Sequence, residues 1–110
     1  MRQSTEVIDY FLQEIRKRLG ARLKQVILFG SRARGDAVPD SDYDCLLVLD
    51  EVSPAVKDAI DEVAGEVLYR YNIVLSIFPI SERKHYERIY DPFLMNIRKE
   101  GITLWTSAKS

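Results

Sequence analysis

Two apolar runs on either side of a polar loop constrain the fold of this chain more than any other sequence feature. Residues 26–29 (VILF) lead into residues 30–35 (GSRARG), and residues 45–49 (CLLVL) follow residues 41–44 (SDYD). Short apolar runs bounded by turn-forming and polar residues are typical of buried strands. The sequence therefore predicts two strands that bracket a polar loop, which is the layout of an active site.

The polar loop contains groups suited to binding phosphate and metal. Gly30 has no Cβ, so it and Ser31 let backbone N–H groups and one hydroxyl approach a phosphate closely. Asp42 and Asp44 are two residues apart, and on an extended strand their carboxylates point to one face. Such carboxylates repel each other unless a cation lies between them, and Mg²⁺ is commonly held by one or two carboxylates plus substrate phosphates.

The spacing of these residues resembles that of a known superfamily. Gly30-Ser31, ten intervening residues and then Asp42-Tyr43-Asp44 look like the signature of the nucleotidyltransferases that include DNA polymerase β and kanamycin nucleotidyltransferase. The Gly-Ser-Arg-x-Arg-Gly opening and the small size resemble the minimal nucleotidyltransferases within it. The resemblance implies that Ser31 and the nearby backbone bind the triphosphate of a nucleotide, and that Asp42 and Asp44 bind divalent metal.

Three further polar residues of the loop are candidates for nucleotide binding. Arg32 and Arg34 follow Ser31 directly, where a short helical turn is expected. Either arginine alone would be interpreted as part of a surface salt bridge, but beside Gly-Ser we expect at least one to bind phosphate, because a guanidinium fork matches phosphate oxygens. Ser41 is expected to orient the end of the loop.

The rest of the chain predicts a small α/β (α+β) domain that spans residues 1–110. The expected order is α-β-β-α-β-α-α in a mixed sheet with flanking helices, which is the polymerase β-like fold that the resemblance implies. Expected elements are a helix over residues 4–19 with Ser4 or Thr5 as N-cap, strands over 25–29 and 45–49, a helix over 54–69 with Ser53 as N-cap, a strand over 73–78, a helix over 82–90 with Ser81 as N-cap, a helix over 92–100 opened by Asp91-Pro92, and an edge strand over 102–105. The strand over 73–78 is apolar on both faces, which predicts a central position, and Pro79 is expected to end it.

One departure from the family pattern concerns a third carboxylate. Related enzymes place this acid on the strand that follows the helix, beside the Asp-x-Asp strand, where it completes the metal site and takes a proton from the attacking hydroxyl. Residues 72–78 (NIVLSIF) contain no acid, and Asn72 and Ser76 are their only polar side chains. This weakens a second metal site but leaves one ion to be held by Asp42, Asp44 and the phosphates.

Composition limits the other classes of function. A net charge of −1 argues against a protein that holds duplex DNA mainly by charge, and no apolar run approaches the length of a membrane span. The N-terminus shows no signal-peptide pattern, and the lone Cys45 excludes an internal disulfide. We therefore expect a cytoplasmic protein, with Cys45 as a core residue and the lone His85 as an exposed surface residue.

Two functions remain open at this stage. The first is transfer of a nucleoside monophosphate, most simply AMP from ATP with Mg²⁺, to a hydroxyl of a partner protein; the resemblance implies a small helical HEPN toxin as that partner and this chain as its antitoxin. The second is a catalytically incomplete nucleotide-binding module that neutralises a partner by binding it. The intact Ser31, Asp42 and Asp44 favour the first, and the acid-free strand favours the second. A homo-oligomer is compatible with the sequence, which does not determine oligomeric state.

Overall fold

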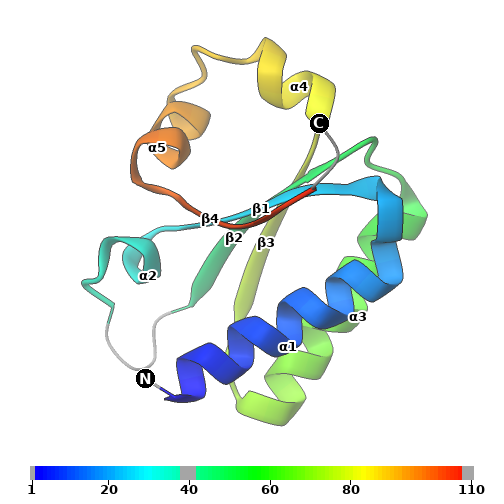
Figure 1. Cartoon of the computed structure of the whole chain (residues 1–110), viewed down its shortest axis with the longest axis vertical. Coiled ribbons are helices and arrows are strands. Elements are labelled where there is room, and N and C mark those ends of the chain that lie inside the picture. The colour runs from blue at the N-terminus through cyan, green and yellow to red at the C-terminus, as the bar shows by residue number, and fades with distance from the viewer. Residues whose placement is uncertain (1, 38–41, 108–110) are drawn as a thin grey trace.

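The chain folds as a four-stranded sheet with helices on both faces. The computed structural model describes residues 2–37 and 42–107. The elements are α1 (Arg2–Leu19), a 3-10 turn η1 (Gly20–Arg22), β1 (Leu23–Phe29), α2 (Ser31–Arg34), β2 (Tyr43–Leu49), α3 (Pro54–Tyr71), β3 (Leu75–Ser81), α4 (Glu82–Glu87), α5 (Pro92–Glu100) and β4 (Ile102–Thr106). In Figure 1 the sheet separates α1 and α3 from α4 and α5.

The sheet is mixed, as the sequence predicts. Its strand order is β3-β2-β1-β4. β1 pairs antiparallel with both β2 and β4, whereas β2 and β3 are parallel and joined by α3. This arrangement brings the C-terminal end of β1 and the N-terminal ends of β2 and β3 together at one end of the sheet.

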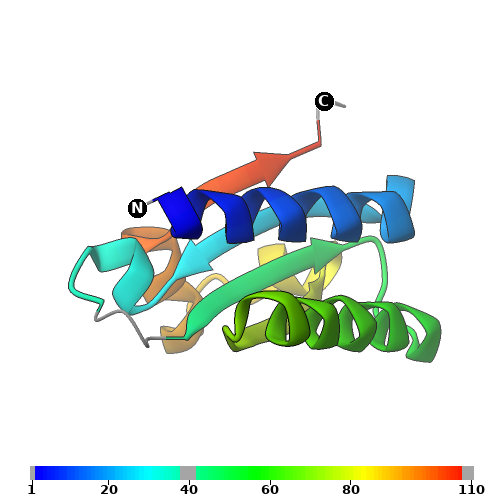
Figure 2. The same cartoon turned by 90° about the horizontal axis from the view of Figure 1, so that it is seen from below.

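The larger core lies between the sheet and the helix pair α1 and α3, which run side by side (Figure 2). Apolar residues recur along α1 at helical spacing, so one face of the helix is buried. α3 and residues of β1, β2 and β3 complete this layer. Its buried side chains are Val7, Phe11, Ile15 and Leu19 from α1, Val56, Ile60, Val63 and Val67 from α3, Leu23, Val26 and Leu28 from β1, Tyr43, Cys45, Leu47 and Leu49 from β2, and Leu75 from β3.

The opposite face of the sheet carries a smaller core. Ile27, Leu46 and Val48 lie on this face and pack against Leu94 and Ile97 of α5. The alternation along β2 divides its residues between the two faces, because successive side chains of a strand point in opposite directions. Asp44 shares the smaller face with Leu46 and Val48.

The helix caps follow the local sequence signals in three cases. Ser53 accepts a hydrogen bond from the N–H of Val56, and Ser81 accepts one from the N–H of Lys84. Asp91 caps α5 by accepting from the N–H groups of its first turn. The prediction that Ser4 or Thr5 caps the first helix is wrong, because α1 already begins at Arg2.

β3 corrects two predictions. It lies at an edge of the sheet rather than in its centre, and it continues through Pro79 to Ser81. Proline lacks the N–H that a central strand needs for its second neighbour, but an edge strand tolerates the loss. Apolar residues on both faces of β3 are therefore compatible with an edge strand. One of these residues, Phe78, is 41% exposed.

The lone histidine and the lone cysteine are both buried. Cys45 lies in the larger core, as predicted, and burial raises the pKa of its thiol to about 12. His85 contradicts the prediction of an exposed residue, because it lies on the inward side of α4 and is only 5% exposed. Burial, and then the nearby Arg98, lowers the pKa of its imidazole. Among the described residues, no helix has the length and apolar character needed to cross a bilayer.

Candidate active site

The backbone of Gly30 lies directly against the carboxyl group of Asp44. Gly30 lies between β1 and α2 as the N-cap residue of α2, with φ 78° and ψ −157°, a conformation that residues with a Cβ rarely adopt. A Cβ at this position would collide with Oδ2 of Asp44. Two independent constraints therefore require glycine here, and both tie the Gly-Ser turn to the second aspartate of the motif.

Asp44 is flanked on both sides by residues of neighbouring strands. It pairs with Phe29 of β1 and with Ser76 of β3. Paired residues of adjacent strands point to the same face of a sheet, so these three side chains lie on the face of the smaller core. Ser76 is therefore the residue beside Asp44 on β3, the strand on which the resemblance to the nucleotidyltransferases implies a third acid.

Asp42 and Asp44 influence each other electrostatically. Partial burial raises the pKa of Asp44, the charge of Asp42 raises it further, and Arg34 offsets part of this effect. Asp42 is exposed and directly precedes β2. Over residues 2–37 and 42–107, no group of three or more His, Cys, Asp or Glu side chains is placed to hold a metal ion. Among the residues that the structure describes, Asp42 and Asp44 are the carboxylates of the motif that could serve a cation here.

The two arginines of the motif point in different directions. The Arg34 guanidinium lies on the Asp44 side, where it contacts Asp36 at 3.3 Å and Glu100 at 3.4 Å. The Arg32 guanidinium lies 4.3 Å from the ring centroid of Tyr43, whose side chain belongs to the larger core on the other face. The structure brings Arg34, and not Arg32, to the face that carries Asp44. Ser31 begins α2 beside Gly30, and the predicted Ser41 lies outside the described residues.

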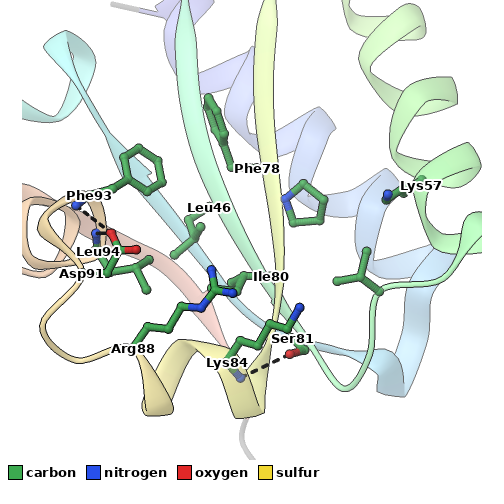
Figure 3. Close-up of a pocket in the computed structure, with 12 residues that line it drawn as sticks. Leu46, Lys57, Phe78, Ile80, Ser81, Lys84, Arg88, Asp91, Phe93 and Leu94 are labelled. Carbon is green, nitrogen blue, oxygen red and sulfur yellow. Dashed lines mark hydrogen bonds between the residues drawn. The ribbon is translucent and has the colours of Figure 1, made fainter.

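A groove beside Asp44 was not predicted from the sequence. We call it the β3 groove and define it by Leu46, Phe78, Ile80, Lys84, Arg88 and Phe93, which line a cavity of about 690 Å³ (Figure 3). Its aromatic end meets Phe29, the strand partner of Asp44, at ring-centroid distances of 5.6 Å for Phe78 and 5.5 Å for Phe93. The signal that could have indicated it is Pro79, which is compatible with an edge strand and so with space beside β3 that no further strand fills.

Known proteins are similar in sequence to this chain. The family described as "Nucleotidyltransferase domain" matches residues 8–102. The "Putative protein adenylyltransferase MJ0604" of Methanocaldococcus jannaschii is 31% identical over 91% of this chain and 96% of its own length. From the same organism, the "Putative protein adenylyltransferase MJ0141" is 38% identical over 88% of this chain and 94% of its own length.

Solved structures share the fold at lower identity. Spectinomycin adenyltransferase AAD(9) from Enterococcus faecialis, with ATP and spectinomycin, has a TM-score of 0.72 and 17% identity, covering 94% of this chain and 56% of that one. A complex of a tri-AMPylated Shewanella oneidensis HEPN toxin with its MNT antitoxin contains a chain with a TM-score of 0.60 and 14% identity, covering 94% of this chain and 72% of that one. Since the family match extends over most of the residues and includes the Gly30–Asp44 segment, this chain belongs to the nucleotidyltransferase domain family.

Proposed function

We propose that this protein transfers AMP from ATP to a hydroxyl group of a partner protein, with Mg²⁺ as the metal. The observation that carries the proposal is the contact between Gly30 and the Asp44 carboxyl, since it fixes the turn suited to phosphates against a carboxylate suited to a cation. The names of the two archaeal relatives, which describe protein adenylyltransferases, support AMP as the transferred group and a protein as its acceptor.

The residues present fit a divalent cation. Partial burial and the neighbouring Asp42 both disfavour the charged form of Asp44, and a cation bound between the two carboxylates would reverse that effect. Hard carboxylate oxygens suit Mg²⁺, and ATP phosphates would supply further oxygens. When bound, the ion would neutralise charge on the phosphates and lower the pKa of the acceptor hydroxyl.

The protein groups would position the nucleotide. The Ser31 hydroxyl and the backbone at residues 30–31 would hold the β- and γ-phosphates, with Arg34 as their cationic partner once it leaves Asp36 or Glu100. Arg32 would act as a positioning residue by stacking on Tyr43. The acceptor oxygen would form a bond to the α-phosphorus while the bond to the β-phosphate bridging oxygen breaks. Pyrophosphate would leave and the hydroxyl proton would pass to solvent.

The partner we propose is a small helical HEPN toxin, with this chain as the antitoxin. The support is the likeness in fold to a chain of the complex between a HEPN toxin and an MNT antitoxin.

Phosphoryl-type transfer depends mainly on positioning and electrostatics, so a small site without a strong base is compatible with turnover. The acceptor protein would bring its own recognition surface to a domain of this size.

A second candidate function is neutralisation of the partner by binding alone. It is favoured by one observation, which is that Ser76 stands beside Asp44 where a third carboxylate would complete the metal site. A serine hydroxyl is neither an anionic ligand nor a useful base at neutral pH. The two candidates differ in whether the partner gains mass, and they are separated below.

The first prediction concerns the aspartate pair. Because the pKa of Asp44 is raised in the folded state, its charge opposes folding above that pKa, so Asp44→Asn should raise the melting temperature at pH 7 by roughly 1–4 °C. The gain should vanish near pH 3, where the carboxyl is protonated in both states. Mg²⁺ should raise the melting temperature of the wild type and of the control variant named next, and should leave that of Asp44→Asn unchanged. Asp61→Asn on the exposed face of α3 is the matched control, and equal responses of all three proteins to Mg²⁺ would rule out the site.

The second prediction separates the enzyme from the binding module. Wild type mixed with its partner, ATP and Mg²⁺ should add one or more AMP groups to the partner, as read by intact mass spectrometry. Asp44→Asn should abolish the addition and Asp61→Asn should preserve it. The rate should continue to rise with pH, because no carboxylate base is available to produce a plateau at low pH. A partner that is silenced equally by wild type and Asp44→Asn, without gain of mass, would establish the binding module instead.

The third prediction uses the register between β2 and β3. Ser76→Asp should increase the transfer rate by about tenfold, because it places a carboxylate beside Asp44 where it can ligate metal or accept the hydroxyl proton. Ser76→Asn is the control, since it has nearly the same shape without the charge. Equal rates for the two variants would contradict the placement of Ser76 at the reacting centre.

A further inference from the structure

The chemistry of displacement at phosphorus indicates from which side of Asp44 the acceptor must approach. This inference rests on the proposed function, in which pyrophosphate leaves toward the Gly30-Ser31 turn at the end of β1. The attacking and leaving oxygens lie roughly in line in such reactions. With phosphorus near Asp44 on β2, the acceptor must therefore approach from the side of β3, which neighbours β2 on the side away from β1.

The β3 groove lies on that side and on the same face of the sheet. Phe78 is two residues after Ser76 on β3, and Leu46 is two residues after Asp44 on β2, so the floor of the groove continues directly from the reacting centre. Figure 3 shows Phe78 and Leu46 from the sheet facing side chains that come from the α4 to α5 segment. The groove therefore lies next to Asp44 on one face of the sheet.

No element of the described chain covers the apolar part of the β3 groove. Phe78 and Phe93 are 41% and 44% exposed, and their ring centroids are 5.6 Å apart. Exposed aromatic side chains that gather at one place are a common feature of binding sites. Here they form a platform that could pack against an apolar or aromatic side chain of an incoming segment.

The polar part of the groove is cationic. Lys84 and Arg88 extend from the α4 side, and Lys57 lines the same cavity from α3 (Figure 3). None of these three side chains forms an ion pair with another described residue, whereas Arg83 on the same helix pairs with Glu87 at 3.0 Å. Asp91 is the one acid among the lining residues, and its carboxylate caps α5. The groove therefore has unneutralised positive charge beside its apolar platform.

We propose that the β3 groove docks an acidic segment of the acceptor protein. Glutamate or aspartate side chains of that segment would pair with Lys84 and Arg88, an apolar side chain would pack on Phe78 and Phe93, and the acceptor hydroxyl would lie next to Asp44. The groove thus selects the acceptor by the charge of the residues around the modified hydroxyl. Adenosine of the nucleotide is the competing occupant, and the experiment separates it.

The test uses charge reversal with a matched control on the same helix. Two labelled peptides share one tyrosine and one leucine and differ only in carrying glutamates or lysines around them. Their binding to wild type, Lys84→Glu/Arg88→Glu and Arg83→Glu is measured by fluorescence anisotropy, with and without a non-hydrolysable ATP analogue and Mg²⁺. Wild type and Arg83→Glu should bind the acidic peptide at least about tenfold more tightly than the basic one, and the double variant should lose or invert this preference.

Two results would overturn the proposal. One is a wild type that binds the acidic peptide no better than the basic one. The other is a double variant with weakened Mg·ATP affinity by calorimetry, which would assign the groove to the nucleotide. Circular dichroism of each variant verifies that the exposed substitutions leave the fold intact. Failure of the proposed function has a different signature, because wild type would then bind no Mg·ATP while the peptide preference, measured without nucleotide, would still test the groove.

Discussion

The close approach of the Gly30 backbone to the Asp44 carboxyl is the constraint on which the candidate site depends. It requires a residue without a Cβ at the end of β1, a positive φ that starts α2, and an acid at one register position of β2. Because β1 and β2 are antiparallel neighbours with buried side chains on both sides, their register cannot slip without exposing the core. The stability of the sheet therefore fixes how Gly30 and Asp44 lie relative to each other.

The two faces of the sheet differ in how much they contribute to the core and in how much of them is exposed. The face covered by α1 and α3 contains most of the buried side chains, and Arg18 joins these helices by contacts of 2.6 Å to Glu62 and to Glu66. The other face has a smaller core under α5 and leaves Phe78 exposed beside Asp44. A domain of this size can leave one face open to a partner because the other face supplies most of the hydrophobic stabilisation.

Local signals predicted much of the fold, and tertiary packing accounts for what they missed. The caps Ser53, Ser81 and Asp91 could be predicted because a capping side chain accepts its hydrogen bond from the first turn of the same helix. The edge position of β3 could not be predicted, because an apolar strand sequence is compatible both with a central strand and with an edge strand beside an open groove. His85 was missed because its polar neighbours in sequence do not reveal how α4 packs.

The site shows the same division between local and tertiary information. The Gly-Ser turn and the aspartate pair were identifiable from residue type and spacing. The same information does not distinguish Arg32 from Arg34. Residues two apart on a helical turn point in nearly opposite directions, so only the structure distinguishes the one near Asp44 from the one on Tyr43.

The most direct test of the account is a crystal structure with Mn²⁺ in place of Mg²⁺ and a non-hydrolysable ATP analogue, read by the anomalous signal of the metal. The account predicts an anomalous peak in contact with Asp42 and Asp44 and the terminal phosphates against Gly30 and Ser31. A peak away from both carboxylates, or phosphates bound elsewhere on the chain, would contradict it.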